Sequence, residues 1–349
     1  MKFGAVPLAQ ALGAILAHSV DLPNGRLRKG QALEADNLAA MAAQGMEQVT
    51  VARLEEGDLH ENAAARLIAE ALVPDPEAAG VRLSTAFTGR VNLVATRPGV
   101  VQLDATRIRA LNAVDPMITL ATLPDFHQVG SGQMVGTVKI ISYAVPQTHA
   151  EAAAEAARAA MRVEAVKLRN ATLIITEIPG GPGEKGRAAI EARLAALGME
   201  LVQCQLVPHR TEALCEAIKS VMAQDTDLVL ILTGSATSDA FDVAPEALRQ
   251  AGGRIERFGM PVDPGNLLFL GEIGMRKVIG LPGCARSPAL NGADWVLSRV
   301  AAGLEVSSDD IAAMGVGGLL KEIPTRPMPR AGRKRAASTA EALGETSED

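Results

Sequence analysis

One stretch of the chain combines residue types that could bind a phosphate-bearing ligand. Residues 233–247 read TGSATSDAFDVAPEA and follow the apolar run 227–233, DLVLILT. Gly234 allows a sharp turn at the end of such a strand, and Ser235 and Ser238 present hydroxyl groups. Backbone N–H groups between a strand and a helix can hold an anion. The stretch therefore predicts a polar loop that contacts a ligand, beginning at Thr233.

Two acidic residues in this loop have two possible roles. Asp239 and Asp242 could hold a metal ion or orient a polar group of a ligand, because carboxylates are ligands for hard cations. The alternative is an ordinary strand–loop–helix turn in which Asp242 is the N-cap of the helix. Spacing alone does not decide between these two interpretations.

Two later stretches contain turns that bring the backbone close to a ligand. They are MPVDPGNLLFLGEIG over 260–274 and KVIGLPGCARSPA over 277–289. Ordinary turn chemistry is the alternative for both, and Cys284 is expected to be a small, partly buried apolar side chain rather than a nucleophile. The candidate binding residues here are Pro264, Gly265, Asn266, Pro282, Gly283, Cys284 and Ser287.

In this order, the three stretches resemble the molybdopterin-binding family shared by molybdopterin adenylyltransferases and molybdopterin molybdotransferases. The first resembles the signature T-G-G-x-G-x-x-x-x-D-V-x-P, and the others resemble its K-P-G-K-P loop and its G-L-P-G-N-P-x-S segment. The resemblance covers about 135 residues, and the first 150 residues are partly similar to a molybdotransferase N-terminus. The arrangement also resembles the N-terminal part of bacterial proteins that fuse such a domain to a nucleotidyltransferase. The signature residues that match in register are Thr233, Gly234, Asp242, Val243 and Pro245.

The resemblance implies molybdopterin as the ligand, Mg²⁺ as a possible companion ion, and Asp242 as a functional acid near the pterin phosphate. Five positions that depart from the family pattern bear on ligand or metal binding. Ser235 and Thr237 replace two glycines, and Cys284 stands where asparagine is usual. His209 and Arg210 stand where the family has acidic residues, and cations there would compete with Mg²⁺.

Three functions are therefore open. The first is a molybdopterin-binding protein in molybdenum-cofactor biosynthesis or delivery, with phosphoryl, nucleotidyl or molybdate transfer if it is catalytic. The second is a non-catalytic carrier of the cofactor, which the altered acidic positions favour. The third is a hydrolase of pyridine-nucleotide or ADP-ribose compounds on the same fold. Expected partners are molybdopterin or its nucleotide form, a nucleotidyltransferase or a molybdoenzyme, and a second copy of the chain.

The elements that position these loops alternate between strand and helix from residue 171 to 304. Apolar runs such as 172–178 and 227–233 do not alternate with polar residues, which is typical of strands buried on both faces. The pattern predicts the α/β class with a mostly parallel sheet between two helical layers. Ligands of such sheets bind beyond the carboxyl ends of the strands. We assign residues 165–305 to this molybdopterin-binding domain.

The rest of the chain is expected to form two further regions. Residues 1–150 read as a mixed α+β region, and the Ala-rich segment 147–170 is predicted to be one connecting helix. Residues 306–349 form a tail that is predicted to be disordered from about Pro327. The basic run at 333–335 is too short to indicate a nucleic-acid partner.

The composition limits the class of protein. The formal net charge is −6, which gives no overall attraction to nucleic acid or to an anionic membrane. The three cysteines have no zinc or disulfide spacing, so reduced thiols and a cytoplasmic location are expected. No apolar run is long enough to predict a membrane span.

Overall fold

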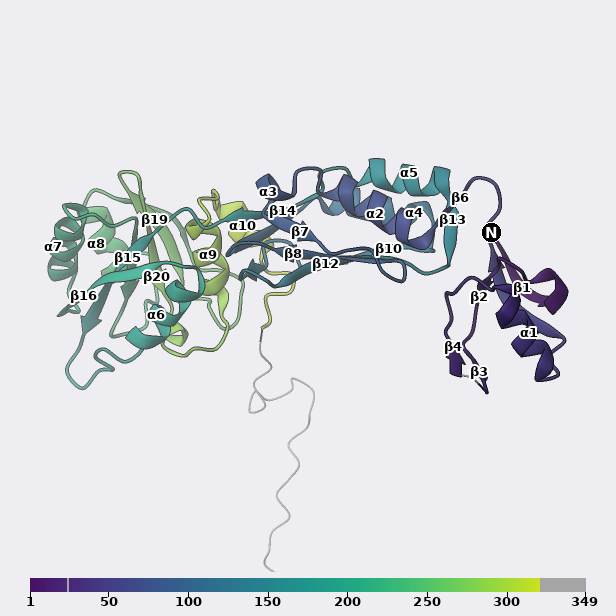
Figure 1. Cartoon of the computed structure of the whole chain (residues 1–349). Helices are drawn as coiled ribbons and strands as arrows, with labels where there is room; N and C mark the ends of the chain where they lie inside the picture. Colours follow the sequence, from purple (N-terminus) through teal and green to yellow (C-terminus); the bar gives the residue numbers. More distant parts are fainter. Residues whose placement is uncertain (24, 321–349) are drawn as a thin grey trace, which may run out of the picture.

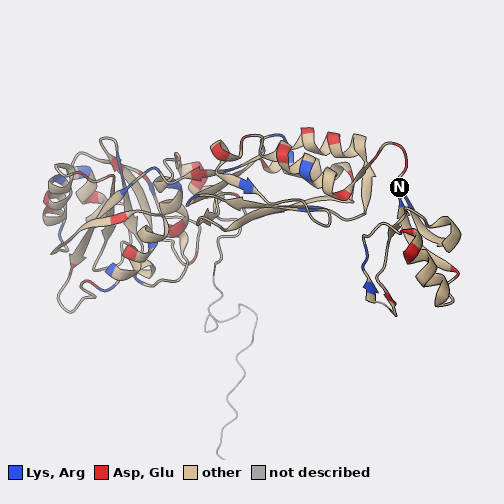
Figure 2. Cartoon of the chain, viewed as in Figure 1, with Lys and Arg blue, Asp and Glu red and all other residues tan. Residues whose placement is uncertain are grey.

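The computed structural model describes residues 1–23 and 25–320, which form three successive parts (Figure 1). Residues of both charge signs are distributed over all three parts of the chain (Figure 2). No helix of the described residues is long and apolar enough to cross a bilayer. The disorder predicted from Pro327 and the basic run at 333–335 lie outside the described residues.

The first part is a small antiparallel β-structure with one α-helix. Its three-stranded sheet has the order β1-β5-β2, and β3 pairs with β4 as a separate hairpin. Leu16, Leu33, Met41 and Val51 form the centre of its core. The elements are β1 (Lys2–Pro7), η1 (Leu8–Gln10), β2 (Ile15–Leu16), β3 (Val20–Leu22), β4 (Gly25–Leu27), α1 (Ala35–Ala43) and β5 (Gln48–Arg53).

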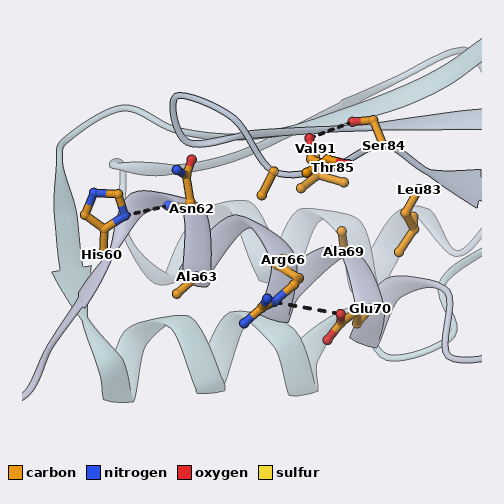
Figure 3. Close-up of a pocket in the computed structure, with 11 residues that line it drawn as sticks. His60, Asn62, Ala63, Arg66, Ala69, Glu70, Leu83, Ser84, Thr85 and Val91 are labelled. Carbon is orange, nitrogen blue, oxygen red and sulfur yellow. Dashed lines mark hydrogen bonds and ion pairs between the residues drawn. The ribbon is translucent and has the colours of Figure 1, made fainter. Parts of the chain in front are cut away.

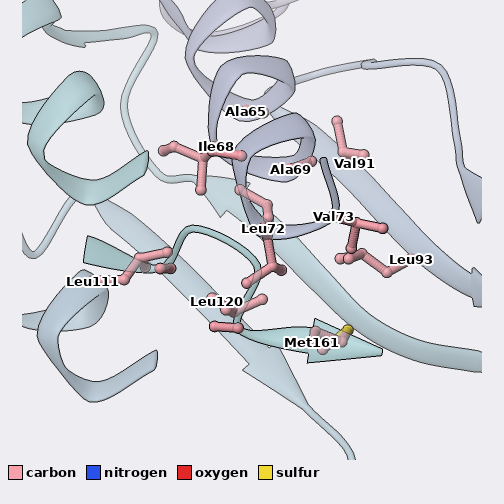
Figure 4. Close-up of a cluster of buried hydrophobic side chains, with 14 of the residues drawn as sticks. Ala65, Ile68, Ala69, Leu72, Val73, Val91, Leu93, Leu111, Leu120 and Met161 are labelled. Atoms are coloured by element: carbon pink, nitrogen blue, oxygen red, sulfur yellow. The ribbon is translucent and has the colours of Figure 1, made fainter. Parts of the chain in front are cut away.

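The second part packs helices on antiparallel sheets with the orders β10-β12-β8-β7 and β11-β9-β14. Ile68 and Leu72 of a central helix pack among buried strand residues such as Leu93 and Leu120 (Figure 4). The strands are β6 (Asp58–His60), β7 (Val81–Leu83), β8 (Arg90–Ala95), β9 (Gly99–Leu103), β10 (Ile118–Thr122), β11 (Gln128–Val129), β12 (Met134–Ile140), β13 (Ala144–Pro146) and β14 (Met161–Ala165). The helices are α2 (Glu61–Leu72), α3 (Pro76–Ala79), α4 (Ala105–Val114) and α5 (Gln147–Ala156).

The prediction of one helix over 147–170 is wrong. Helix α5 ends at Ala156, and the chain then forms β14, which pairs antiparallel with β9. Helix propensity favours the alanines, but Met161 and Val163 alternate with polar residues and bury their side chains in the core of this part. Pairing and burial therefore override local propensity beyond Ala156.

The third part contains a six-stranded sheet of order β16-β15-β17-β20-β19-β18, which confirms the α/β class. The pairs β16–β15, β15–β17 and β17–β20 are parallel, and β20–β19 and β19–β18 are antiparallel. The strands are β15 (Asn170–Glu177), β16 (Glu200–Pro208), β17 (Leu228–Leu232), β18 (Arg254–Phe258), β19 (Phe269–Ile273) and β20 (Arg276–Leu281).

Helices cover both faces of this sheet (Figure 1). Leu173 and Ile175 pack in one buried cluster with α6 (Arg187–Ala196) and α9 (Gly292–Ala301), and Ile174 packs in the other with α7 (Thr211–Met222) and α8 (Val243–Gln250). Successive strand side chains point to opposite faces, so an uninterrupted apolar run supplies both cores. Helix α10 (Ser308–Ala313) extends the first cluster with Ile311.

Candidate functional site

The carboxyl ends of the four parallel strands bring the predicted loops to one edge of the sheet. Register places Ile175 beside Leu232 and Leu232 beside Leu281, so the segments that follow β15, β17 and β20 begin next to one another. Phe258 pairs with Phe269, which pairs with Gly280, so the β18–β19 loop reaches this edge as well. All three predicted stretches therefore meet where ligands of such sheets bind.

The turn after β17 packs tightly against the end of β15. The Gly234 N–H donates to Thr176 Oγ1 at 2.9 Å. A Cβ at Gly234 would lie 2.6 Å from the Thr176 carbonyl oxygen, so only glycine fits there without a shift of the backbone. The Thr233 carbonyl accepts a hydrogen bond from Arg286 at 2.7 Å, and its hydroxyl lies 3.3 Å from that of Thr237.

Both acidic side chains of the loop accept hydrogen bonds from its own backbone. Asp242 Oδ1 accepts from the Val243 N–H at 2.7 Å, and its Oδ2 accepts from the Ser238 N–H at 2.9 Å. Asp239 Oδ1 accepts from the Phe241 N–H at 2.8 Å. Asp242 is thus the N-cap of α8 and closes the loop. The exposed polar groups of the loop are the Asp239 carboxylate and the Ser235 and Ser238 hydroxyls, the last 3.3 Å from the Ala236 carbonyl.

The segment after β20 is a short 3-10 turn, η2 (Gly283–Arg286), that begins beyond Pro282. Cys284 is half-buried, and burial raises the pKa of its thiol, so the thiol form is favoured over the nucleophilic thiolate. Ser287 Oγ accepts from the Ala289 N–H at 3.3 Å. These side chains shape the turn, and a Cβ at Gly283 would meet nothing within 4 Å, so its backbone is open to approach.

The β18–β19 loop is closed by its own backbone and by α9. The Pro264 carbonyl accepts from the Gly292 N–H at 2.8 Å, and Gly265 has a φ of 142° where an added Cβ would meet that same nitrogen. Asn266 Nδ2 donates to the Met260 carbonyl at 3.4 Å, and the main-chain carbonyl of Asn266 accepts from the Met260 N–H at 3.0 Å. The side chain of Asn266 therefore holds the loop in shape.

Two arginines that the sequence did not single out connect these loops. Arg193 of α6 is buried and its Nε lies 2.6 Å from Asp294 Oδ1, while its other nitrogens donate to the carbonyls of Ala285 and Ser287 at 2.9 and 2.7 Å. Arg286 links η2 to Thr233, and burial lowers the pKa of its guanidinium, which still stays charged. The available signal was an arginine on the apolar stripe of a helix, three residues after Ile190.

The residues at this edge do not fit a magnesium ion. Both oxygens of Asp242 and one oxygen of Asp239 accept backbone hydrogen bonds, and His209 and Arg210 follow β16. Within the described part of the chain, no group of three or more His, Cys, Asp or Glu side chains is placed to hold a metal ion. Mg²⁺ prefers near-octahedral oxygen ligands, which this edge does not supply.

A cavity of about 470 Å³ opens beside these loops, between the Gly-rich segment 177–183 and the end of β16 at 206–208. Three glycines line it together with larger side chains, among them Ile178, Leu206 and Val207. Another cavity, of about 410 Å³, lies in the second part between α2 and the β7–β8 connection (Figure 3). None of the predicted site residues lines either cavity.

Residues 177–301 match the model of a family described as "Probable molybdopterin binding domain". This segment is a domain of the molybdopterin-binding family. The domain begins at the last residue of β15 and ends at the last residue of α9, so it contains all the loops described above. Residues 5–53 match a second model, a domain of unknown function (DUF8806), which lies within the first part.

Solved structures similar to the chain include three molybdopterin biosynthesis proteins. The MoeA protein from Pyrococcus horikoshii has a TM-score of 0.32 at 13% identity and covers 86% of this chain and 75% of that chain. A protein from Mycobacterium abscessus has a TM-score of 0.29 at 16% identity, with coverages of 39% and 94%. MoaB from Thermus thermophilus has a TM-score of 0.27 at 18% identity, with coverages of 39% and 89%. TM-scores this low carry no argument about function, so the assignment of the molybdopterin-binding domain rests on the family model. No curated protein matches the sequence.

Proposed function

We propose that the chain is a molybdopterin-binding protein of molybdenum-cofactor biosynthesis or delivery, and that it acts as a carrier. The observation that supports this ligand is that residues 177–301, which match the molybdopterin-binding family model, contain the loops at the carboxyl ends of the parallel strands. The edge presents the exposed Ser235 and Ser238 hydroxyls, the open backbone at Gly283, and the Gly-rich cavity. Backbone N–H groups and hydroxyls of this kind hold a phosphate and the polar edge of a ring.

The carrier role is favoured over transfer chemistry because Asp242, the candidate catalytic acid, caps a helix with both of its oxygens. A catalytic carboxylate must reach the substrate or a metal ion, whereas both oxygens of Asp242 accept backbone hydrogen bonds. Arg210 adds positive charge, and His209 an imidazole, where metal-binding carboxylates would be needed. Backbone N–H groups, hydroxyls and a cationic side chain can bind the phosphate of a pterin without a metal ion. Binding of such a phosphate is therefore the chemistry that these residues support best.

The identity of the ligand is tested by mass spectrometry and pterin fluorescence of material released from the purified protein. We expect a pterin phosphate. An ADP-ribose or pyridine-nucleotide compound in its place would favour the hydrolase hypothesis. A transfer assay with molybdopterin, ATP and Mg²⁺ separates carrier from enzyme, and robust adenylylation by the unmodified protein would contradict the carrier role.

Substitution of Asp242 separates capping from ligand binding. Asp242→Ala is expected to lower the free energy of unfolding by about 1 kcal/mol, the usual cost of a lost N-cap. Asp242→Asn keeps one acceptor oxygen for the Val243 N–H but sets an NH2 group against the exposed Ser238 N–H, so it is expected to cost less than the alanine variant without being neutral. If the carboxylate charge contacts the pterin phosphate or its ion, Asn weakens binding more than Ala weakens it per unit of lost stability. Denaturation and molybdopterin titration of the same preparations measure both, and a less stable Ala variant with unchanged binding limits Asp242 to the cap.

A further inference from the structure

Three neighbouring strands are joined at their carboxyl ends by one buried hydroxyl. Thr176, the penultimate residue of β15, is 1% exposed. Its Oγ1 accepts the Gly234 N–H from the turn after β17 at 2.9 Å. The same oxygen lies 2.8 Å from Nδ1 of His209, the first residue after β16. The His209 ring is therefore tied to the turn at the centre of the proposed site.

The hydrogen bond between Thr176 and His209 Nδ1 orients the ring and leaves Nε2 as the nitrogen that faces away from Thr176. A threonine oxygen has one proton and two lone pairs, so with the Gly234 N–H as one incoming donor the hydroxyl either donates to His209 Nδ1 or accepts a second hydrogen bond from it. A neutral imidazole that accepts at Nδ1 carries its proton on Nε2. The His209 main-chain N–H donates to the Glu177 carbonyl at 2.8 Å, so the backbone is held as well. In the tautomer that accepts at Nδ1, the side chain is thus an oriented donor at Nε2.

The Nε2 nitrogen of His209 has no hydrogen-bond partner among the described residues. Within residues 1–23 and 25–320, no group forms a hydrogen bond with Nε2. The side chain of His209 is half-buried, but Nε2 itself is not one of the buried side-chain atoms that lack a partner. This nitrogen is therefore accessible to solvent at the ligand edge. Arg210 follows it, is exposed, and gives the N-terminus of α7 no side-chain cap. The nearby acidic groups, Glu177 and Glu212, are exposed and make no ion pair with His209 among the described residues.

We propose that His209 anchors the phosphate of the ligand through a hydrogen bond from Nε2, with Arg210 supplying positive charge. The site then captures a phosphate monoester without a divalent cation. A carboxylate at the same position would repel the phosphate and would need a divalent cation between the two. This inference rests on the proposed function for the pterin part of the ligand. The phosphate part rests on the relay from Gly234 through Thr176 to His209.

Two substitutions separate the two halves of the imidazole. The oxygen of His209→Asn can accept the Thr176 hydroxyl as Nδ1 does, but this side chain has no donor at the place of Nε2. His209→Gln reaches as far as Nε2 with an N–H donor and gives up the contact near Nδ1. If Nε2 binds phosphate, asparagine loses affinity and glutamine retains most of it. If only the contact between Thr176 and Nδ1 matters, asparagine retains most of the affinity and glutamine loses it.

The experiment is equilibrium titration in EDTA with three probes, a phosphorylated pterin, the same pterin without its phosphate, and inorganic phosphate. Thermal unfolding of each variant verifies that the chain remains folded. We expect His209→Asn to weaken the two phosphate-bearing probes by about ten- to hundredfold, the range for a hydrogen bond to a charged group, and to leave the dephosphorylated pterin unchanged. We expect the wild-type affinities to be the same with Mg²⁺ in place of EDTA.

Each other result has a defined meaning. Phosphate binding that depends on His209 without any pterin binding supports the anchor and contradicts the proposed function. An affinity for the phosphorylated pterin that neither substitution changes contradicts the role of His209 and is compatible with the proposed function. A requirement for Mg²⁺, or no binding of any probe, overturns the inference.

Discussion

Arg193→Met is expected to lower the free energy of unfolding of the third part by about 3–5 kcal/mol, the usual cost of removing one partner of a buried ion pair. The methionine fills the volume of the side chain but leaves the Asp294 carboxylate without its cation. It also leaves the carbonyls of Ala285, Ser287 and Ala289 without their donor, which the arginine supplies at 2.9, 2.7 and 3.0 Å. The turn after β20 should then lose its fixed shape.

A single tryptophan makes this measurement specific. Trp295, the only tryptophan of the chain, lies on α9 next to Asp294, so its fluorescence follows unfolding of the third part. Arg187→Met is the matched control, because that arginine makes exposed pairs with Glu184 and Glu191. Such pairs contribute about 1 kcal/mol or less. Equal denaturation midpoints for the two variants would show that the buried network does not stabilise the domain.

Gly234→Ala is expected to have the second large effect, on both stability and binding. The added methyl would lie 2.6 Å from the Thr176 carbonyl oxygen and 3.2 Å from the Ile178 nitrogen, which are backbone atoms and cannot rotate away. Overpacking of this kind costs about 1–3 kcal/mol. The displaced turn should lose the hydrogen bond to Thr176, and binding should weaken by about tenfold or more, as expected for one lost charge-assisted hydrogen bond.

Gly283→Ala is the control for stability in the same part of the chain. Its added Cβ would have no heavy atom within 4 Å, so its unfolding midpoint should equal that of the wild type. Denaturation followed through Trp295, with molybdopterin titration of the folded protein, compares the two glycines. A Gly234→Ala protein with wild-type stability and affinity would mean that the turn adapts and does not define the site.

The fold of the third part could be predicted because the apolar pattern of its strands is compatible with few arrangements of strands and helices. Runs such as 172–178 have apolar side chains on both faces, which requires helices above and below a mostly parallel sheet. Topology then places the loops that follow such strands at one edge. The orientation of β18 and β19 was not predictable, since both are short and each could pair in either direction. The segment 147–170 was misassigned because propensity is local and the β14–β9 pairing is not.

The roles of individual site residues were less predictable than their location. An aspartate before a helix reads the same in sequence whether it caps the helix or binds a ligand, and hydrogen-bond geometry assigns the cap to Asp242. The Arg193 network joins residues 92 to 101 positions apart, which no local pattern connects. His209 stood out in the sequence only as a departure from the family pattern. Its contact with Thr176 gives that departure a physical meaning.

The most direct test of the central claim is an equilibrium titration of the purified chain with molybdopterin in EDTA, in parallel for the wild type and Gly234→Ala. The proposed site predicts saturable binding by the wild type, and binding at least about tenfold weaker by the folded variant. Equal affinities for the two proteins, or no binding by the wild type, would contradict the assignment of the ligand to the edge formed by residues 233–242.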